Sequence, residues 1–225
     1  MFCDKSKFLK LFVGAAICIS AFAIEVSAGD KSSMYPYSTD GKYIEPKYLF
    51  EILKSRNIDK IIETTNDIKK MANEKKILNV VIDLWAKNDE KYPDLPWDII
   101  TTDVVRLELA DILIQAKKNR VMDLEISSMH TFVSRLIQGD DYRTKLQALL
   151  VLPLFNDPRD VPIILDVIKT PGSAWFRAGV RTLAAMCNDS AKAALDELEK
   201  SLADPKEKRI FIETRRFFES LEICR

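Results

Sequence analysis

Apolar side chains recur every three to four positions along most of this chain, from residue 46 almost to its end. In residues 122–138, for example, Ile126, Met129 and Val133 fall on one face of a helix and form a stripe that can be buried. No segment shows the strict alternation of a half-buried strand. We therefore predict an all-α protein with helices over residues 46–56, 58–73, 75–88, 97–117, 122–138, 142–155, 159–169, 174–187, 191–202 and 206–224.

The breaks between these segments carry residues that end and begin helices. Asp157 and Asp204 each precede a proline. A carboxylate there can cap free N–H groups, and proline tolerates the first helical turn. Gly139 stands where one helix must end. We expect Asp140 and Asp189 to cap the helices that follow them.

The first 28 residues have the pattern of a cleavable signal peptide. Three lysines within the first ten residues precede an uncharged apolar run of 14 residues, 11–24, and the small residues Ser27 and Ala28 follow. A membrane-spanning helix needs about 20 apolar residues, so an uncleaved anchor is the less favoured alternative. We predict cleavage after Ala28, which makes the mature chain periplasmic or secreted. A flexible arm would then cover residues 29–45, and a helical domain residues 46–225.

Part of the helical pattern repeats along the sequence. An offset of 34 places the helix that contains Arg143 over the helix that contains Arg177, and their apolar residues superpose. Offsets of 32 and 37 superpose the helices of Arg209 and Arg106 in the same way. Four units of the sequence therefore align with one another. A planar guanidinium can engage a carboxylate through two hydrogen bonds, and we expect each arginine to reach a carboxylate of the neighbouring unit.

Two segments resemble the HEAT repeat, particularly its short bacterial form. They are the turn and helix that begin at Asp157, DPRDVPIIL, and the helix opening at Trp175, WFRAGVRTL. The likeness covers residues 103–221 and extends to 46–88 by analogy. It implies an α-solenoid of about four to five stacked antiparallel helix pairs, in which each unit buries the apolar stripe of its neighbour. In this family the concave surface usually holds a partner protein or peptide.

Charge limits the kinds of partner. Removal of the signal peptide would leave 31 basic and 32 acidic side chains, a nearly neutral chain. Long-range attraction to nucleic acid or to an anionic membrane is therefore not expected. A partner has to be recognised locally, through shape and short-range contacts.

The mature chain would keep two cysteines, Cys187 and Cys224, because Cys3 and Cys18 belong to the signal peptide. An even pair in an exported protein predicts one disulfide. Two buried free thiols are the alternative.

Candidate chemistry is sparse. His130 is the only histidine, and two cysteines with one histidine cannot complete a four-ligand zinc site, so we expect no metal and no cofactor. The carboxylate pairs Asp140–Asp141 and Asp157–Asp160 could serve acid–base chemistry, but each stands at a predicted helix start. We interpret them as helix caps.

Large aromatic residues near turns are the candidate binding residues. Trp97, Tyr142, Trp175 and Phe176 each stand at or near the beginning of a predicted helix. Aromatic side chains bury much area at an interface for few frozen torsions. In a helical array they can instead be buried where two neighbouring units pack together.

These observations predict a non-enzymatic, exported protein-binding module. Our specific hypothesis is an immunity protein that neutralises a toxin acting in the periplasm. A scaffold or assembly factor of an envelope complex is one alternative. The other is an envelope hydrolase, which would need two carboxylates in one groove with the pKa of at least one raised by burial.

Overall fold

The computed structural model describes residues 45–70, 75–170 and 173–220. The predicted signal peptide, nearly all of the predicted arm, and Cys224 lie outside the described residues. Every regular element within the described ranges is a helix, which confirms the all-α prediction. The helices are α2 (Pro46–Lys54), α3 (Ile58–Lys70), α4 (Lys75–Trp85), α5 (Trp97–Ile100), α6 (Asp103–Lys118), α7 (Ser127–Gln138), α8 (Tyr142–Val151), η1 (Leu152–Leu154), η2 (Pro158–Asp160), α9 (Val161–Lys169), α10 (Ser173–Met186), α11 (Asp189–Ser201) and α12 (Pro205–Ser220).

Several helix bounds differ by a few residues from the prediction, and two predicted helices differ more clearly. Residues 97–117 divide into α5 and α6, because the hydroxyl of Thr101 donates to the carbonyl oxygen of Trp97 at 2.6 Å and that of Thr102 to Ile99 at 2.7 Å. Such local bonds compete with helix propagation. The helix predicted from residue 122 begins only at Ser127, whose backbone N–H donates to the Glu125 carboxylate at 2.7 Å.

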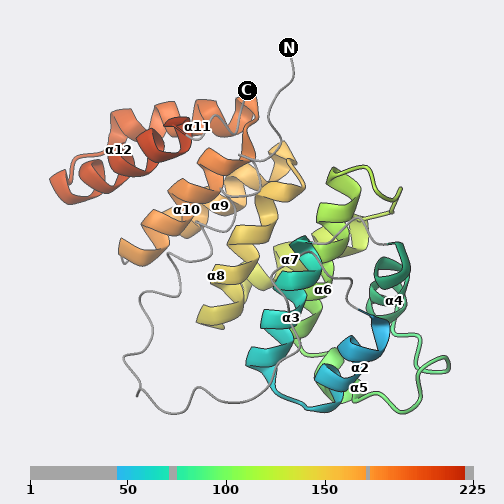
Figure 1. Cartoon of the computed structure of the whole chain (residues 1–225). Helices are drawn as coiled ribbons and strands as arrows, with labels where there is room; N and C mark the ends of the chain where they lie inside the picture. The colour runs from blue at the N-terminus through green and yellow to red at the C-terminus, as the bar shows by residue number, and fades with distance from the viewer. Residues whose placement is uncertain (1–44, 71–74, 171–172, 221–225) are drawn as a thin grey trace. The chain divides into compact units, whose positions relative to one another are not determined.

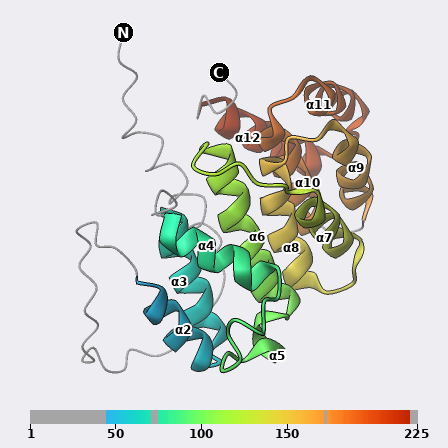
Figure 2. The ribbon, with the colours of Figure 1, turned by 90° about the vertical axis from the view of Figure 1, so that its right-hand side faces the viewer.

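The helices pack in two rows within the compact unit of residues Ile44–Arg225. Row A is α3, α6, α8, α10 and α12, each packed against the next. Row B is α4, α7, α9 and α11. In this row α4 packs on α6, α7 on α8, and both α9 and α11 on α10. Figures 1 and 2 show α6, α8 and α10 side by side along row A.

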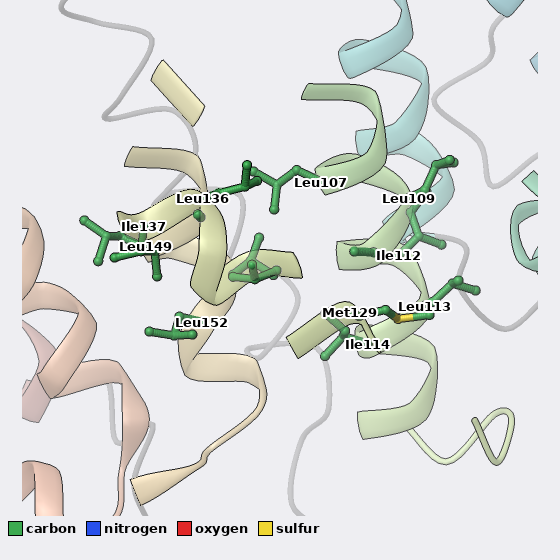
Figure 3. Packing of buried hydrophobic residues seen from close by; sticks show 14 of the residues in the cluster. Leu107, Leu109, Ile112, Leu113, Ile114, Met129, Leu136, Ile137, Leu149 and Leu152 are labelled. Atoms are coloured by element: carbon green, nitrogen blue, oxygen red, sulfur yellow. The ribbon is translucent and has the colours of Figure 1, made fainter. Parts of the chain in front are cut away.

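Helix α6 lies at the centre of the core, between α3 and α4 and against α8. It is apolar around most of its circumference, as a helix surrounded by others must be. The residues that it buries include Leu107, Leu109, Ile112, Leu113 and Ile114. Figure 3 shows Leu107 facing Leu136 of α7, while Leu109 points to the opposite side of α6. No described helix combines the length and the apolar character needed to cross a bilayer.

Residues separated by nearly the repeat offset meet between α8 and α10 and at the ends of these helices. The hydroxyl of Thr182 in α10 lies 3.0 Å from the carbonyl oxygen of Leu149 in α8, 33 residues earlier. At the helix ends, the side-chain amide of Asn188 donates to the Asn156 side chain at 3.0 Å, 32 residues earlier. The two separations, 33 and 32 residues, are close to the offset of 34 between the helices of Arg143 and Arg177.

Candidate functional site

Tyr142 and Trp175 form an aromatic pair on the surface of row A. Tyr142 opens α8 and Trp175 stands in the first turn of α10. Because these two helices pack together, the rings meet edge to face with centroids 4.9 Å apart and planes at 65°. Tyr142 is 53% exposed, and the ammonium of Lys145 lies 5.2 Å from the Trp175 ring centroid. The structure thus brings two of the four predicted contact residues together.

The other two aromatic candidates lie elsewhere. Phe176 is 3% exposed and belongs to the hydrophobic core, so we remove it from the candidate contact residues. As the next residue after Trp175, it points about 100° further around α10, toward the core. Trp97 is half-buried, and its ring N–H donates to the carbonyl oxygen of Tyr92 at 2.9 Å. It lines a separate cavity of about 560 Å³ together with Arg56 and Asp98.

Leu150 is a further exposed apolar residue of α8 that was not among the predicted contact residues. It is 49% exposed, which is unusual for a leucine in the middle of a protein's helical array. Tyr142, Leu146 and Leu150 follow one another at intervals of four residues and therefore lie along one face of α8. The spacing was visible in the sequence, but apolar residues at intervals of four normally mark the buried face of a helix.

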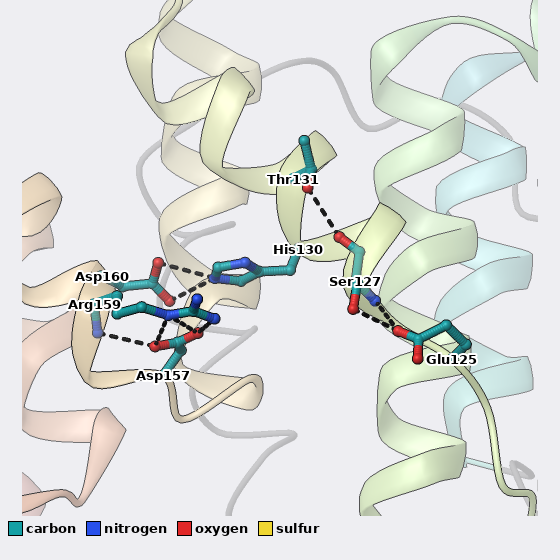
Figure 4. A network of polar contacts seen from close by, with 7 residues as sticks. All are labelled: Glu125, Ser127, His130, Thr131, Asp157, Arg159 and Asp160. Carbon is teal, nitrogen blue, oxygen red and sulfur yellow. Dashed lines mark hydrogen bonds and ion pairs between the residues drawn. The ribbon is translucent and has the colours of Figure 1, made fainter.

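A second candidate site is a cavity of about 530 Å³ between α7 and the start of α9. Its main polar contact is between His130 in α7 and Asp160 in η2. The His130 Nε2 atom lies 2.9 Å from Asp160 Oδ1 and 3.0 Å from Oδ2. Asp160 is 1% exposed, and the ring of Phe155 packs edge to face on His130 with centroids 4.8 Å apart. Figure 4 shows the histidine ring pointing at the carboxylate.

The two carboxyl groups of this cavity have opposite pKa shifts. Burial raises the pKa of Asp160, although the hydrogen bond and charge of His130 work against it. Asp157 accepts from the side chain and backbone N–H of Arg159, and these bonds lower its pKa to about 2. Asp157 thus caps η2, as predicted for this position. Asp160 makes no cap hydrogen bond, which corrects its interpretation as a helix cap.

The hydroxyl groups near His130 have other contacts. Ser127 donates to the Glu125 carboxylate at 2.5 Å, and Thr131 donates to the carbonyl oxygen of Ser127 at 3.0 Å. The Ser134 hydroxyl is buried and has no hydrogen-bond partner among the residues that the structure describes. The cavity therefore combines an acid and a histidine in contact, but its serine at Ser127 is directed to a different carboxylate (Figure 4).

The repeated arginines do not share one role. The guanidinium of Arg106 stacks 4.1 Å from the ring centroid of Trp85 and donates to the Trp85 carbonyl oxygen at 3.3 Å. Its ring contacts continue to Phe132 of α7, at 5.4 Å. The prediction that Arg106 reaches a carboxylate is therefore wrong. The repeat in the sequence does not show that Trp85 of α4 and Phe132 of α7 place their aromatic rings against Arg106.

The other three arginines lie on the surface. Arg143 reaches a carboxylate, Asp59 at 3.6 Å, but Asp59 belongs to α3, which α6 separates from α8 in row A, and not to the neighbouring unit as predicted. The partner of Arg209, at 3.9 Å, is Glu213 in its own helix. Arg177 is exposed, and no carboxylate in the described part of the chain lies within ion-pair distance of it.

Cap positions near α8 and α11 differ by one residue from the prediction. Asp141 caps α8 through the backbone N–H of Thr144 at 2.8 Å, where we expected Asp140. Asn188 caps α11 through Ala191 N–H at 2.8 Å, where we expected Asp189.

Cys187 is disulfide-bonded in the structure. Its predicted partner, Cys224, lies outside the described residues. The described residues hold no group of three or more histidine, cysteine, aspartate or glutamate side chains arranged to bind a metal ion.

Comparison with known proteins gives no match: no family model, no curated protein and no solved structure is significantly similar to this chain.

Proposed function

We propose that this chain is a HEAT-like α-solenoid of about four to five helix pairs. The packing of each row A helix on the next supports this arrangement. So do the hydrogen bonds between positions 33 and 32 residues apart, since stacked units of one length place equivalent positions side by side.

Within this fold we propose a non-enzymatic, exported protein-binding module. The single observation that carries the proposal is the exposed ring of Tyr142, which packs on the half-buried ring of Trp175. The same helix also exposes Leu150. Aromatic residues dominate the energetics of interfaces, and large apolar side chains gathered on a surface are typical of interaction sites. An immunity protein that neutralises a periplasm-acting toxin is the specific role that we favour. A scaffold or assembly factor for an envelope complex is the alternative.

A photo-crosslinking experiment tests the binding proposal. A photoreactive phenylalanine analogue replaces Tyr142 in the chain expressed from Met1, and a second variant carries it at Lys192, which is exposed on α11. We expect a discrete cross-linked protein from position 142 alone, identified by mass spectrometry. A toxin encoded next to this chain would favour immunity, and an envelope-assembly protein the scaffold role.

The identified partner then allows a quantitative test. The double variant Y142A/W175A should bind it at least about 30-fold more weakly, as expected for two interface anchors. Circular dichroism and thermal unfolding must show that the variant is folded. Unchanged affinity in a folded variant would refute this contact site.

Export has its own test. N-terminal sequencing and intact mass of the chain from the producing cell's envelope fraction should show a protein that begins at Gly29. A cytosolic chain that retains its first 28 residues would contradict export.

A hydrolase is the second candidate function. It would need two carboxylates in one groove with the pKa of at least one raised by burial, and the cavity of His130 meets part of this requirement. Asp157 and Asp160 line it together, and burial raises the pKa of Asp160. Carboxyl groups whose pKa values are pushed apart can serve as an acid and a base. Incubation with dye-labelled peptidoglycan would reveal such an activity, and D160N should abolish it. No release of dye by the purified chain would count against this function.

A further inference from the structure

A cluster of charged and aromatic side chains lies where α4, α6 and α7 meet. The guanidinium of Arg106 in α6 lies 4.1 Å from the ring centroid of Trp85 in α4 and 5.4 Å from that of Phe132 in α7. The two rings meet edge to face, with centroids 5.5 Å apart. The guanidinium of Arg135 lies 5.1 Å from the same Phe132 ring. We call Trp85, Arg106, Phe132 and Arg135 the Arg106 cluster.

The guanidinium of Arg106 keeps most of its donors available. Arg106 is half-buried, and the acceptor that the described residues offer its guanidinium is the Trp85 carbonyl oxygen, at 3.3 Å. A guanidinium carries several N–H donors in a fixed planar fork. None of the carboxylates that the structure describes lies within ion-pair distance of Arg106. Contacts with two rings restrict the side chain, so little conformational entropy is lost when a ligand binds to it.

The charges around Arg106 do not balance. Arg135 pairs with Asp103 at 2.9 Å, and the two side chains are 65% and 50% exposed. Burial and the charge of Arg135 lower the pKa of Arg106, and Asp103 offsets this effect only in part. Because a guanidinium stays protonated in proteins, Arg106 remains a half-buried cation. Two cations and one carboxylate leave a local excess of one positive charge.

We propose that the Arg106 cluster binds a carboxylate of a partner protein, an aspartate or glutamate side chain that accepts hydrogen bonds from the Arg106 guanidinium. The inference rests on the protein-binding function proposed above and adds a contact made by different helices. A planar guanidinium fits a carboxylate through two parallel hydrogen bonds. The methylene groups of the acid can lie against the half-buried rings of Trp85 and Phe132. Tryptophan and arginine are also enriched among the residues that dominate binding energies.

A phosphate group fits this cluster less well. One carboxylate matches the excess positive charge, whereas a phosphate monoester carries about 1.5 to 2 negative charges at neutral pH and would also face the Asp103 carboxylate. A nucleic acid would need a broad positive surface, and this chain has equal numbers of basic and acidic residues. The charges therefore favour an acidic side chain.

Nuclear magnetic resonance with a defined probe tests the inference. The probe is glutamate with both backbone ends blocked, so that its side chain carries the charge, and blocked glutamine is the neutral counterpart. In the isotope-labelled chain, the Arg106 Nε–Hε signal and the Trp85 indole N–H signal should shift saturably with blocked glutamate, with a Kd of about 1–10 mM for a ligand of this size. Blocked glutamine should leave both signals in place.

Three variants separate binding from a purely structural role. R106K keeps the positive charge but loses the planar fork, so the affinity measured through the Trp85 signal should fall at least about tenfold. R216K makes the same replacement at an exposed position on α12 and should leave the affinity unchanged. D103N removes the carboxylate that competes for Arg135, so binding should tighten by about two- to fivefold. A role of Arg106 limited to holding α4 against α7 predicts no such tightening.

Several results would overturn the inference. They are no saturable shift, the same shift with blocked glutamine, equal losses in R106K and R216K, no tightening in D103N, or tighter binding of methyl phosphate than of blocked glutamate. None of them bears on the partner captured at Tyr142. That partner, once identified, should bind R106K at least about fivefold more weakly. If Y142A/W175A loses the partner while R106K retains it, the binding function stands and the carboxylate contact is refuted.

Discussion

A buried lysine joins the first two helices of row A. The Lys69 ammonium lies 2.7 Å from Glu108 Oε2 and 2.6 Å from Asp111 Oδ2, and all three side chains are at most 13% exposed. Burial acts to lower the pKa of Lys69, but the charges of Asp111 and Glu108 outweigh it and raise the pKa. The cation therefore persists at any physiological pH and holds two carboxylates in place between α3 and α6.

Lys69→Met should lower the free energy of unfolding by about 3–5 kcal/mol, because it leaves two buried carboxylates facing each other without a counter-charge. Urea denaturation measures the change. Lys70→Met is the matched control, since Lys70 is 53% exposed and its ion pair among the described residues is with Asp67 on the surface. It should cost no more than about 1 kcal/mol. Similar losses in the two variants would contradict a special role for the buried ion triad.

The buried carboxyl of Asp160 makes stability depend on pH. Its pKa is raised by burial, so the folded chain holds this proton more tightly than the unfolded chain does. The stabilising effect of this group is complete below the unfolded pKa and is lost as pH rises through the folded pKa.

Asp160→Asn should therefore gain stability relative to the wild type as pH increases from about 4 to about 7. The amide oxygen can still accept a hydrogen bond from His130, so the contact between α7 and η2 is retained. Chemical denaturation at several pH values gives the difference curve. For the surface variant Asp166→Asn, the stability difference from the wild type should not change with pH. A flat curve for Asp160→Asn as well would mean that burial of this carboxyl is immaterial to stability.

Row A and row B meet most closely where α10 crosses α9. Gly179, in the middle of α10, faces Ile168 of α9 so closely that a Cβ atom at this position would overlap the isoleucine side chain. Glycine inside a helix costs about 1 kcal/mol relative to alanine. The close approach of the two helices explains why this cost is tolerated.

Gly179→Ala should accordingly destabilise the protein by about 1–3 kcal/mol, since the overlap outweighs the gain in helix propensity. In the background Ile168→Ala the same change should be neutral or stabilising. Thermal unfolding of the two single variants and the double variant completes a double-mutant cycle, which measures the interaction between the two positions. Additive effects would show that the two residues do not touch.

The helices themselves could be predicted from the sequence, because burial of a stripe imposes its spacing on residues such as Met129 and Val133. Contacts between helices could not. The bond of His130 to Asp160 joins residues 30 positions apart, and its existence depends on how α7 lies against η2. The aromatic surroundings of Arg106 were hidden for the same reason. Of the candidate site, the sequence identified Tyr142 and Trp175 but not their contact.

The whole helical unit is held by contacts between helices that are close neighbours in sequence. A disulfide at Cys187, at the end of α10, adds a covalent constraint. If Cys224 is the partner, the crosslink ties the last two helices to α10. The stabilisation would come mainly from restriction of the unfolded chain.

Reduction or Cys187→Ser should lower the free energy of unfolding by about 3–4 kcal/mol, the value expected for a closed loop of about 37 residues. Alkylation followed by intact mass should show Cys187 blocked without reductant and labelled with it. Cys224→Ser should free the Cys187 thiol. Equal labelling of the wild type in both conditions would mean free thiols, and a blocked Cys187 in the Cys224→Ser variant would mean a different partner.

The bonds from Thr182 to Leu149 and from Asn188 to Asn156 have a consequence for how such a chain can change its length. Each joins residues 33 or 32 positions apart, so in the proposed solenoid each would link one helix pair to nearly the same place in the pair before it. A tandem duplication of such a stretch in the gene would therefore supply a new pair whose donors and acceptors already match both neighbours. Evolution can then lengthen or shorten the protein in whole steps without redesigning its interior.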